Sequence, residues 1–438
     1  LAFQYKLYKF AMLVFSFDVQ SYKTSVMAMK KLMMTMLLLV CSVYLGFAKV
    51  PNNKLNEQLL RYDYSQVLMR NDLLGYIGNG QRLYMHFDTI YKDKANPHWY
   101  HVEGKSKVKQ NLCSFTGRID LHSFAPNEQL DPNVKRYKLK AQYRFNEDKT
   151  QNGSGFFAGS FTSYFIIYQD TAYFDSIEDG ADGYNNNQFE GHWTSYRTKV
   201  SKKANFGVGR IPDSNDLDVG SAEFYVTPNK QHLGWESYMK AFETVTPEGQ
   251  KAQAEEDREW WKGDKEIFIS WQLKTENGAF KLDIYSNKHY LQTLDLGKID
   301  SDYWVEQRDY NFDGHRDFAV WLYYSAKRPV FLWSEKQGKY VHEPFFDKLE
   351  SPTIFDEAHC IVDTHDVSND VVEERMYSCS TRGYRLISTL LRHPSNSKIL
   401  QMKVYDDAGR CVREVQSPTY KQLTPLWQKY VILYFLGY

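Results

Sequence analysis

A short motif, aromatic-x-Gly-x-apolar, recurs three times in the first half of the chain and limits what that half can fold into. The copies occupy residues 115–119, 157–161 and 189–193. In a strand the outer two residues share a face with the glycine, which is typical of a sheet that bends or of a neighbouring ring that crosses closely. Turn signals at 152–153 and 182–183 separate the copies. The pattern predicts an antiparallel meander that curls into a barrel or a sandwich.

The rest of the chain also indicates strands. The chain contains 33 tyrosines, 27 phenylalanines and 10 tryptophans, residue types that favour half-buried pleated surfaces. An Asn277-Gly278 turn between alternating segments 267–273 and 280–285 is a strong hairpin signal. A chain of 438 residues is too long for one ordinary core, so we expect two domains. The prediction is a mainly β protein with two antiparallel domains and few short helices.

The expected domain boundaries follow the changes in pattern along the chain. A β domain covers 75–245, after a partly helical lead-in at 49–74. A second β domain covers 266–417. Between them, 246–265 carries Pro247, Gly249 and a charged run, which predicts a linker that includes one helical turn. The apolar tail 418–438 is too short to cross a membrane; it either docks as a last strand or is an artefact.

The N-terminal region has the features of an export signal. Residues 29–48 combine a basic start, an apolar run and small residues before an expected cleavage after Ala48. Residues 1–28 are interpreted as a spurious or unstructured upstream extension. Lipidation of Cys41 is a minority alternative, since bulky Val40 precedes it. The protein is therefore expected in the periplasm or at the cell surface, with no transmembrane helix after cleavage.

Four cysteines remain after the signal, and an exported protein can pair them. Three lie in the C-terminal half, and the surroundings of Cys360 and Cys379 read as neighbouring strands. This pair is the expected disulfide.

The sharpest chemical motif lies at residues 309–317. Oxygen-bearing side chains recur at loop positions one, three, five and nine, as Asp309, Asn311, Asp313 and Asp317, with glycine at position six. Calcium prefers roughly six to eight oxygen ligands, and this spacing wraps a loop around one ion. His315 would contribute its backbone carbonyl. A tight polar turn is the alternative. Position twelve is Val320, where an EF-hand has glutamate, so other oxygens must complete the shell.

Residues 304–415 resemble a known family. The loop enters an apolar strand, followed by an aromatic-rich segment at 323–333, a Gly-Lys-Tyr-Val step at 338–341 and an acidic turn at 346–349. This order resembles the calcium-binding periplasmic proteins related to the I-type lysozyme inhibitors, some of which act as immunity proteins. The resemblance implies a calcium ion held by the loop residues, but no inhibitory residue can be carried over. The N-terminal domain, with its Gly-Lys-Ser-Lys-Val-Lys segment at 104–109, resembles uncharacterised exported proteins of Bacteroidetes.

Composition and motifs narrow the function. Lys+Arg and Asp+Glu balance at 54 each with no basic stripe, which argues against nucleic-acid binding. No nucleophile elbow, phosphate loop or zinc-protease motif occurs. We expect an exported non-enzymatic binding protein with a calcium-stabilised C-terminal domain that inhibits a lysozyme-like hydrolase. The alternatives are a carbohydrate-binding surface protein that contacts cell-wall glycan through Trp99, Trp193 or Trp235, and a polysaccharide or peptidoglycan hydrolase with paired carboxylates. Residues 179–187 are predicted as a long turn first and a ligand loop second.

Overall fold

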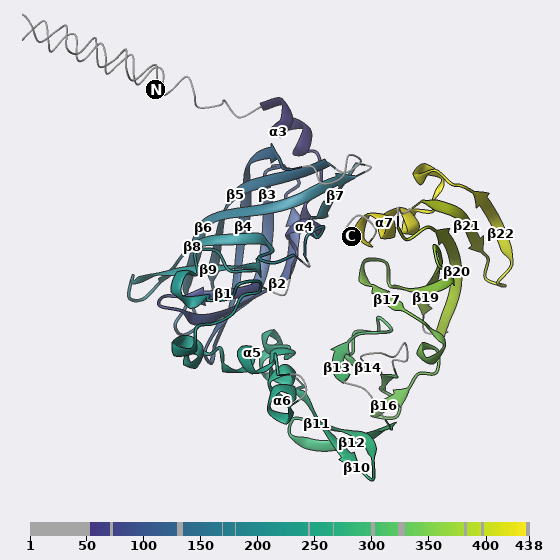
Figure 1. Ribbon diagram of the computed structural model, residues 1–438. Coiled ribbons are helices and arrows are strands. Elements are labelled where there is room, and N and C mark those ends of the chain that lie inside the picture. Colours follow the sequence, from purple (N-terminus) through teal and green to yellow (C-terminus); the bar gives the residue numbers. More distant parts are fainter. Residues whose placement is uncertain are drawn as a thin grey trace, which may run out of the picture. The chain divides into compact units, whose positions relative to one another are not determined.

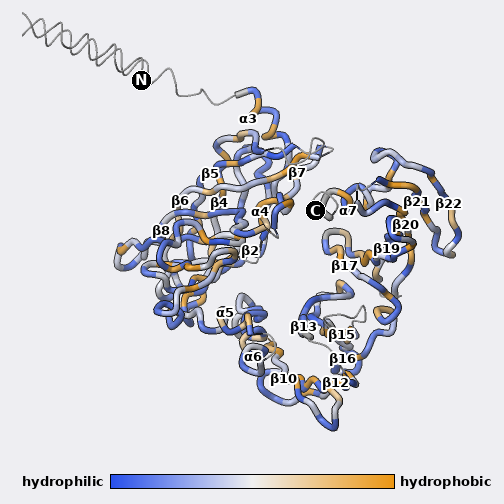
Figure 2. Tube along the Cα trace, viewed as in Figure 1, coloured by the Kyte–Doolittle hydropathy of each residue, from blue (hydrophilic) through white to orange (hydrophobic). Residues whose placement is uncertain are grey.

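A computed structural model describes residues 53–434 except 71–72, 129–134, 169, 180, 244–245, 266, 299–302, 323–328, 381–382 and 396–397. The predicted extension 1–28, signal 29–48 and Cys41 lie outside the described residues. The first of two compact units ends with helix α3 (Asn53–Leu59), and the second begins at Leu60. The mainly β prediction is confirmed (Figure 1). Apolar and polar residues alternate in short stretches along the strands (Figure 2).

Eight antiparallel strands close into a barrel. They pair in chain order, and the ring closes because β9 pairs back onto β1. The short strand β7 (Thr171–Phe174) adds to the end of β6. The barrel strands are β1 (Leu73–Ile77), β2 (Gln81–Lys92), β3 (Trp99–Val108), β4 (Asn111–Pro126), β5 (Lys135–Glu147), β6 (Gly155–Tyr168), β8 (Asn185–Ser195) and β9 (Ser201–Gly209). The predicted curled meander is therefore a closed barrel.

Aromatic rings pack at the centre of this sheet. The rings of Phe189 and Phe206 stack 4.5 Å apart, and Phe161 lies 4.4 Å from Phe189. Phe145 stacks on Phe115 at 5.1 Å. Each of these five side chains is at most 2% exposed. Rings carry large apolar surfaces, so their burial explains why the aromatic content is high.

The glycines of the repeated motif lie where neighbouring strands approach closely. Gly159 and Gly191 are direct partners across β6 and β8. A Cβ on Gly159 would lie 2.0 Å from the carbonyl oxygen of Glu190, and one on Gly117 would lie 2.0 Å from that of Arg144. The motif therefore marks backbone-to-backbone approach in a bent sheet, and not the crossing of a ring.

Substitution of Gly159 by alanine tests this packing. We expect Gly159→Ala to destabilise the barrel by about 2–3 kcal/mol, because the new methyl group must displace backbone. Ser160→Ala, at the exposed neighbouring position, should change stability by less than about 0.5 kcal/mol. Urea unfolding followed by near-UV circular dichroism measures both. Equal stability of the two variants would contradict the close approach.

Short helices flank the barrel strands in the sequence. They are α4 (Ser65–Leu68), which precedes β1, then η1 (Asn215–Leu217), η2 (Pro228–Leu233), α5 (Glu236–Lys240), α6 (Pro247–Glu256) and η3 (Trp260–Lys265). The segment expected to be a linker thus contains a ten-residue helix, α6, which Thr246 caps by accepting a hydrogen bond from the Gly249 amide. Ala254 of α6 is buried in the core of the following sheets, so this helix is part of the C-terminal fold.

The C-terminal region contains three consecutive antiparallel sheets. The first is β10 (Ile269–Glu276), β11 (Ala279–Ser286) and β12 (His289–Gly297). The second is β13 (Tyr303–Arg308), β14 (Asp317–Leu322), β15 (Val330–Ser334) and β16 (Lys339–His342). The third is β17 (Pro352–Phe355), β18 (Cys360–Ser368), β19 (Val371–Ser380), β20 (Gly383–Arg392), β21 (Ile399–Tyr405) and β22 (Cys411–Gln416). Short 3-10 turns η4 (Phe346–Lys348) and η5 (Asp356–Ala358) flank β17.

Shared cores join these sheets. Leu282 and Val320 belong to a core common to the first and second sheets. Tyr310, Val330 and Ile361 belong to another, common to the second and third. The second sheet, which carries the predicted calcium loop, is therefore held by apolar packing on both sides.

The tail was expected to be either a last strand or an artefact, and residues 425–434 form a helix instead. After η6 (Tyr420–Gln422), α7 (Pro425–Tyr434) begins with a proline at its first position, where the missing N–H costs nothing. Trp427 is fully buried and donates from Nε1 to the Ser388 hydroxyl at 2.7 Å. The tail is therefore part of the core of the third sheet. Among the residues that the structure describes, no helix has the length and apolarity needed to span a membrane.

The predicted disulfide between Cys360 and Cys379 is not formed. All four cysteines that the structure describes are free thiols. The strand register explains this, because Cys360 pairs with Ser378 and Cys379 is one residue further along β19. Successive side chains point to opposite faces of a sheet. Cys360 packs in the core with α7, and Cys379 packs on the other face.

Candidate functional site: the acidic loop and its cavity

The acidic loop connects β13 to β14 and is folded around its first carboxylate. Asp309 accepts hydrogen bonds from the amides of Asp313 at 3.1 Å and Gly314 at 2.8 Å. Gly314 has a φ of +88°, a conformation that side chains with a Cβ disfavour. The spacing of aspartates and glycine seen in the sequence therefore produces a closed, tight loop.

Asn311, Asp313 and His315 form the outer part of the loop. The side-chain amide of Asn311 donates from Nδ2 to Asp313 Oδ2 at 2.9 Å. The backbone amide of His315 donates to Asp313 Oδ1 at 2.8 Å. The His315 imidazole also lies 3.3 Å from Asp313 Oδ1. These three side chains are partly or largely open to solvent.

Asp317 lies at the base of the loop and is fully buried. Its two carboxylate oxygens accept from the amides of Tyr310 at 2.9 Å and Trp333 at 2.8 Å. Asp317 therefore ties the loop to β15. The pKa of Asp317 is raised to about 7: burial raises it most, the two amide hydrogen bonds lower it, and the charges of Asp313 and Asp309 contribute a smaller rise.

The loop offers the oxygen ligands that calcium prefers, but its carboxylates do not converge on one point. The predicted ligands are all oxygens, and each Asp317 oxygen keeps a lone pair beyond its one amide bond. Yet among the described residues no three Asp, Glu, His or Cys side chains lie close enough to form a metal-binding group. The calcium site stays a prediction.

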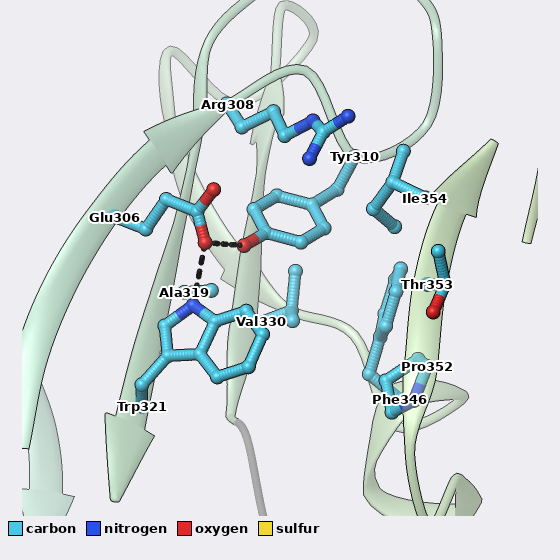
Figure 3. A pocket seen from close by; sticks show the side chains of 10 residues that line it. All are labelled: Glu306, Arg308, Tyr310, Ala319, Trp321, Val330, Phe346, Pro352, Thr353 and Ile354. Atoms are coloured by element: carbon cyan, nitrogen blue, oxygen red, sulfur yellow. Dashed lines mark hydrogen bonds between the residues drawn. The ribbon is translucent and has the colours of Figure 1, made fainter. Parts of the chain in front are cut away.

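A cavity of about 230 Å³ adjoins this loop (Figure 3). One wall comes from β13, the loop and β14, and the other from β17 and the turn before it. The residues that line it are Glu306, Arg308, Tyr310, Ala319, Trp321, Val330, Phe346, Pro352, Thr353 and Ile354. Because Tyr310 is the second residue of the loop, the loop shapes the cavity.

Glu306 is the central polar group of the cavity. Its Oε2 accepts from the Tyr310 hydroxyl at 2.9 Å and from Trp321 Nε1 at 2.6 Å (Figure 3). Burial and the Glu306 charge both raise the pKa of Tyr310, which keeps the phenol protonated as a donor. Arg308 forms an ion pair with Asp356 at the start of η5. The carboxylate of Glu306 is thus fixed in position by two aromatic donors.

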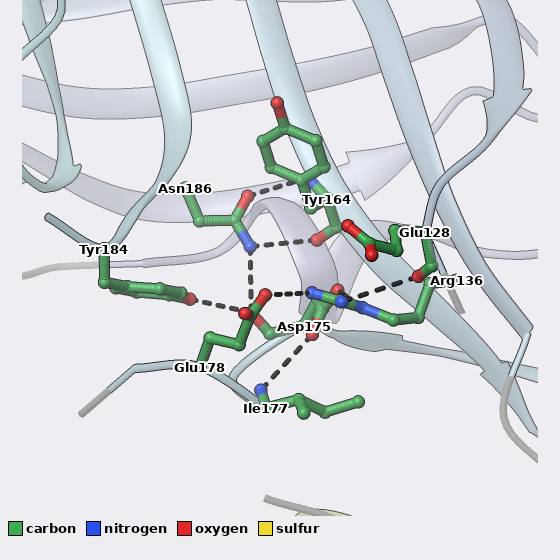
Figure 4. A network of polar contacts seen from close by, with 8 residues as sticks. All are labelled: Glu128, Arg136, Tyr164, Asp175, Ile177, Glu178, Tyr184 and Asn186. Carbon is green, nitrogen blue, oxygen red and sulfur yellow. Dashed lines mark hydrogen bonds and ion pairs between the residues drawn. The ribbon is translucent and has the colours of Figure 1, made fainter. Parts of the chain in front are cut away.

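A second polar network lies in the barrel and has a structural role (Figure 4). Arg136 forms a buried ion pair with Asp175 at 2.7 Å and contacts Glu178 at 2.9 Å. Asn186 donates to the carbonyls of Tyr164 and Asp175. The segment 179–187, predicted as a turn first and a ligand loop second, therefore ends in side chains that satisfy buried backbone groups.

The tryptophans expected to stack on sugars are differently placed. Trp235 is fully buried and donates to the Gly80 carbonyl at 2.8 Å, so it cannot contact a glycan. Trp193 donates to buried Glu147 at 2.9 Å, and Trp99 lies under the guanidinium of Arg118 at 4.3 Å. The expectation that Trp235 contacts a glycan is therefore wrong. The side chains of Trp193 and Trp99 contact other side chains of the barrel sheet.

Comparison with known proteins gives little further guidance. No family model matches the chain, and no curated protein matches it. Among solved structures, the chain is similar to a Xanthomonas protein described as related to a type IV secretion system, with 15% identity and a TM-score of 0.26. That match covers 34% of this chain and 88% of the Xanthomonas protein.

Backbone strain in the loop gives a direct test of its geometry. A Cβ on Gly314 would meet nothing within 4 Å, so any effect of substitution arises from the positive φ alone. We expect Gly314→Ala to cost about 1–2 kcal/mol in the free energy of unfolding. Gly314→Asn should cost less, because asparagine tolerates this conformation. Denaturant unfolding in chelator measures both; an alanine variant as stable as the parent would contradict the loop geometry.

Proposed function

We propose that this chain is an exported, non-enzymatic binding protein whose C-terminal domain is stabilised by calcium and inhibits a lysozyme-like hydrolase. The side chains of Asp309, Asn311, Asp313 and Asp317 and the carbonyl of His315 would hold the ion. The observation that carries the proposal is the fully buried carboxylate of Asp317, whose pKa is raised mainly by burial and to a smaller extent by the charges of Asp313 and Asp309. A divalent cation would relieve this repulsion.

Two further features of the barrel bear on where a partner could bind and on the hydrolase alternative. Aromatic rings pack at the centre of the barrel sheet. A partner would therefore bind to the outer surface of the protein. The buried carboxylate of Glu147 accepts from the Gly155 amide at 2.6 Å and from Trp193 at 2.9 Å. A carboxylate held in this way suits a structural role better than acid catalysis, and the hydrolase alternative finds no support at this position.

Calcium binding is tested by thermal unfolding. A ligand specific for the folded state at a hundred times its dissociation constant adds about 2.7 kcal/mol of stability. We expect millimolar calcium to raise the unfolding temperature of the exported chain, and Asp313→Ala to abolish the rise. Asp407→Ala, which removes a carboxylate that is 95% exposed in the same region, is the matched control. A rise that persists in Asp313→Ala would place the ion elsewhere.

The partner is tested by enzyme inhibition. We expect the calcium-loaded protein to slow hydrolysis of peptidoglycan by an invertebrate-type lysozyme in proportion to the amount of complex formed. The heat-unfolded protein is the control for non-specific adsorption. Undiminished hydrolysis by a panel of wall hydrolases, at protein concentrations well above that of the enzyme, would reject inhibition and leave calcium binding to be judged by its own experiment.

A further inference from the structure

The Glu306 cavity combines a single negative group with apolar and aromatic walls. Ala319, Val330 and Phe346 are each at most 2% exposed and line its interior. Tyr310 and Trp321 line it as rings and also hold the carboxylate. The Glu306 side chain is half-buried and lies between these apolar and aromatic side chains.

Among the residues that the structure describes, Glu306 has no ion-pair partner, since the acceptors and donors around it are neutral. Arg308 is the one cationic side chain among the lining residues, and its charge is engaged by Asp356. Glu306 is held by two neutral donors, a phenol and an indole. A cation would therefore be drawn to the Glu306 carboxylate itself, each oxygen of which can accept more than one hydrogen bond.

We propose that this cavity is a binding site for an organic cation on an apolar stem, namely a lysine or arginine side chain of a partner protein. Such side chains lay their methylene stems along apolar surfaces and keep the charge at the tip. The tip would donate to Glu306, beside the rings of Tyr310 and Trp321 that hold this carboxylate. The volume of about 230 Å³ suits one side chain.

A bare metal ion fits this cavity less well. Metal ions in proteins require several anionic or carbonyl ligands around one point. Glu306 is the one carboxylate among the lining residues, and no metal-binding group of three acidic, histidine or cysteine side chains occurs in the described part of the chain. The proposed cation binding does not require a calcium ion, because none of the lining residues is a predicted calcium ligand. The assignment of a partner protein as its source rests on the proposed function.

Titration calorimetry of the full chain in the presence of chelator tests the site, so the result is independent of calcium binding. The probe is Nα-acetyl-lysine amide, for which we expect a dissociation constant of about 1 mM from its size. Nα-acetyl-norleucine amide has a similar stem without the ammonium group. It should bind at least about tenfold more weakly, since the charge-assisted hydrogen bond is lost.

Variants locate the site. Glu306→Gln keeps an oxygen that can accept from Tyr310 and Trp321 and removes the charge, so the lysine probe should bind about tenfold more weakly. Asp407→Asn, far more exposed, should leave binding within about twofold of the parent. Equal binding of the lysine and norleucine probes to the unmodified chain, or no binding of either, would overturn the proposal. That comparison holds even if Glu306→Gln fails to fold.

Discussion

The buried carboxylate of Asp317 is the interaction on which the C-terminal region depends. It accepts from one amide in the acidic loop and from one amide in β15, and so fixes the loop against the second sheet. Burying a carboxylate is unfavourable unless it is hydrogen-bonded or paired with positive charge. Two amide donors meet part of that need. The proposed calcium ion would meet the rest, which connects the fold to the function we propose.

The position of the loop determines the cavity beside it. The amide of Tyr310 binds Asp317, and its hydroxyl binds Glu306. One residue therefore joins the predicted metal site to the proposed cation site. A loop that loses its geometry would also lose the donor that orients Glu306. Calcium would therefore affect the cavity through Tyr310, although the cavity can bind a cation without it.

The sequence predicted those features that depend on local pattern. The Asn277-Gly278 turn joins β10 and β11, with both residues at positive φ. The repeated glycine motif indicated a curled meander, which is the closed barrel. The 309–317 motif predicted a tight loop with Gly314 at its turn.

Features that depend on tertiary register were not predictable. The Cys360–Cys379 pair fails because the strands align Cys360 with Ser378. Residues 425–434 form a helix whose Trp427 is buried and donates to Ser388 in the third sheet. The proline at 425 was a sequence signal for the start of a helix. Glu306 carries no motif of its own. It was missed because the two rings that hold it come together only when β13, the loop and β14 fold as a hairpin, and the cavity is closed only by β17.

Hydrogen exchange with and without calcium tests the central claim most directly, because it reports on the loop itself. If the ion binds the acidic loop, the amides of Asp313, Gly314 and Trp333 should exchange more slowly in calcium than in chelator, while the amides of the barrel strands stay unchanged. Identical exchange of the 309–317 segment in the two conditions would contradict the account.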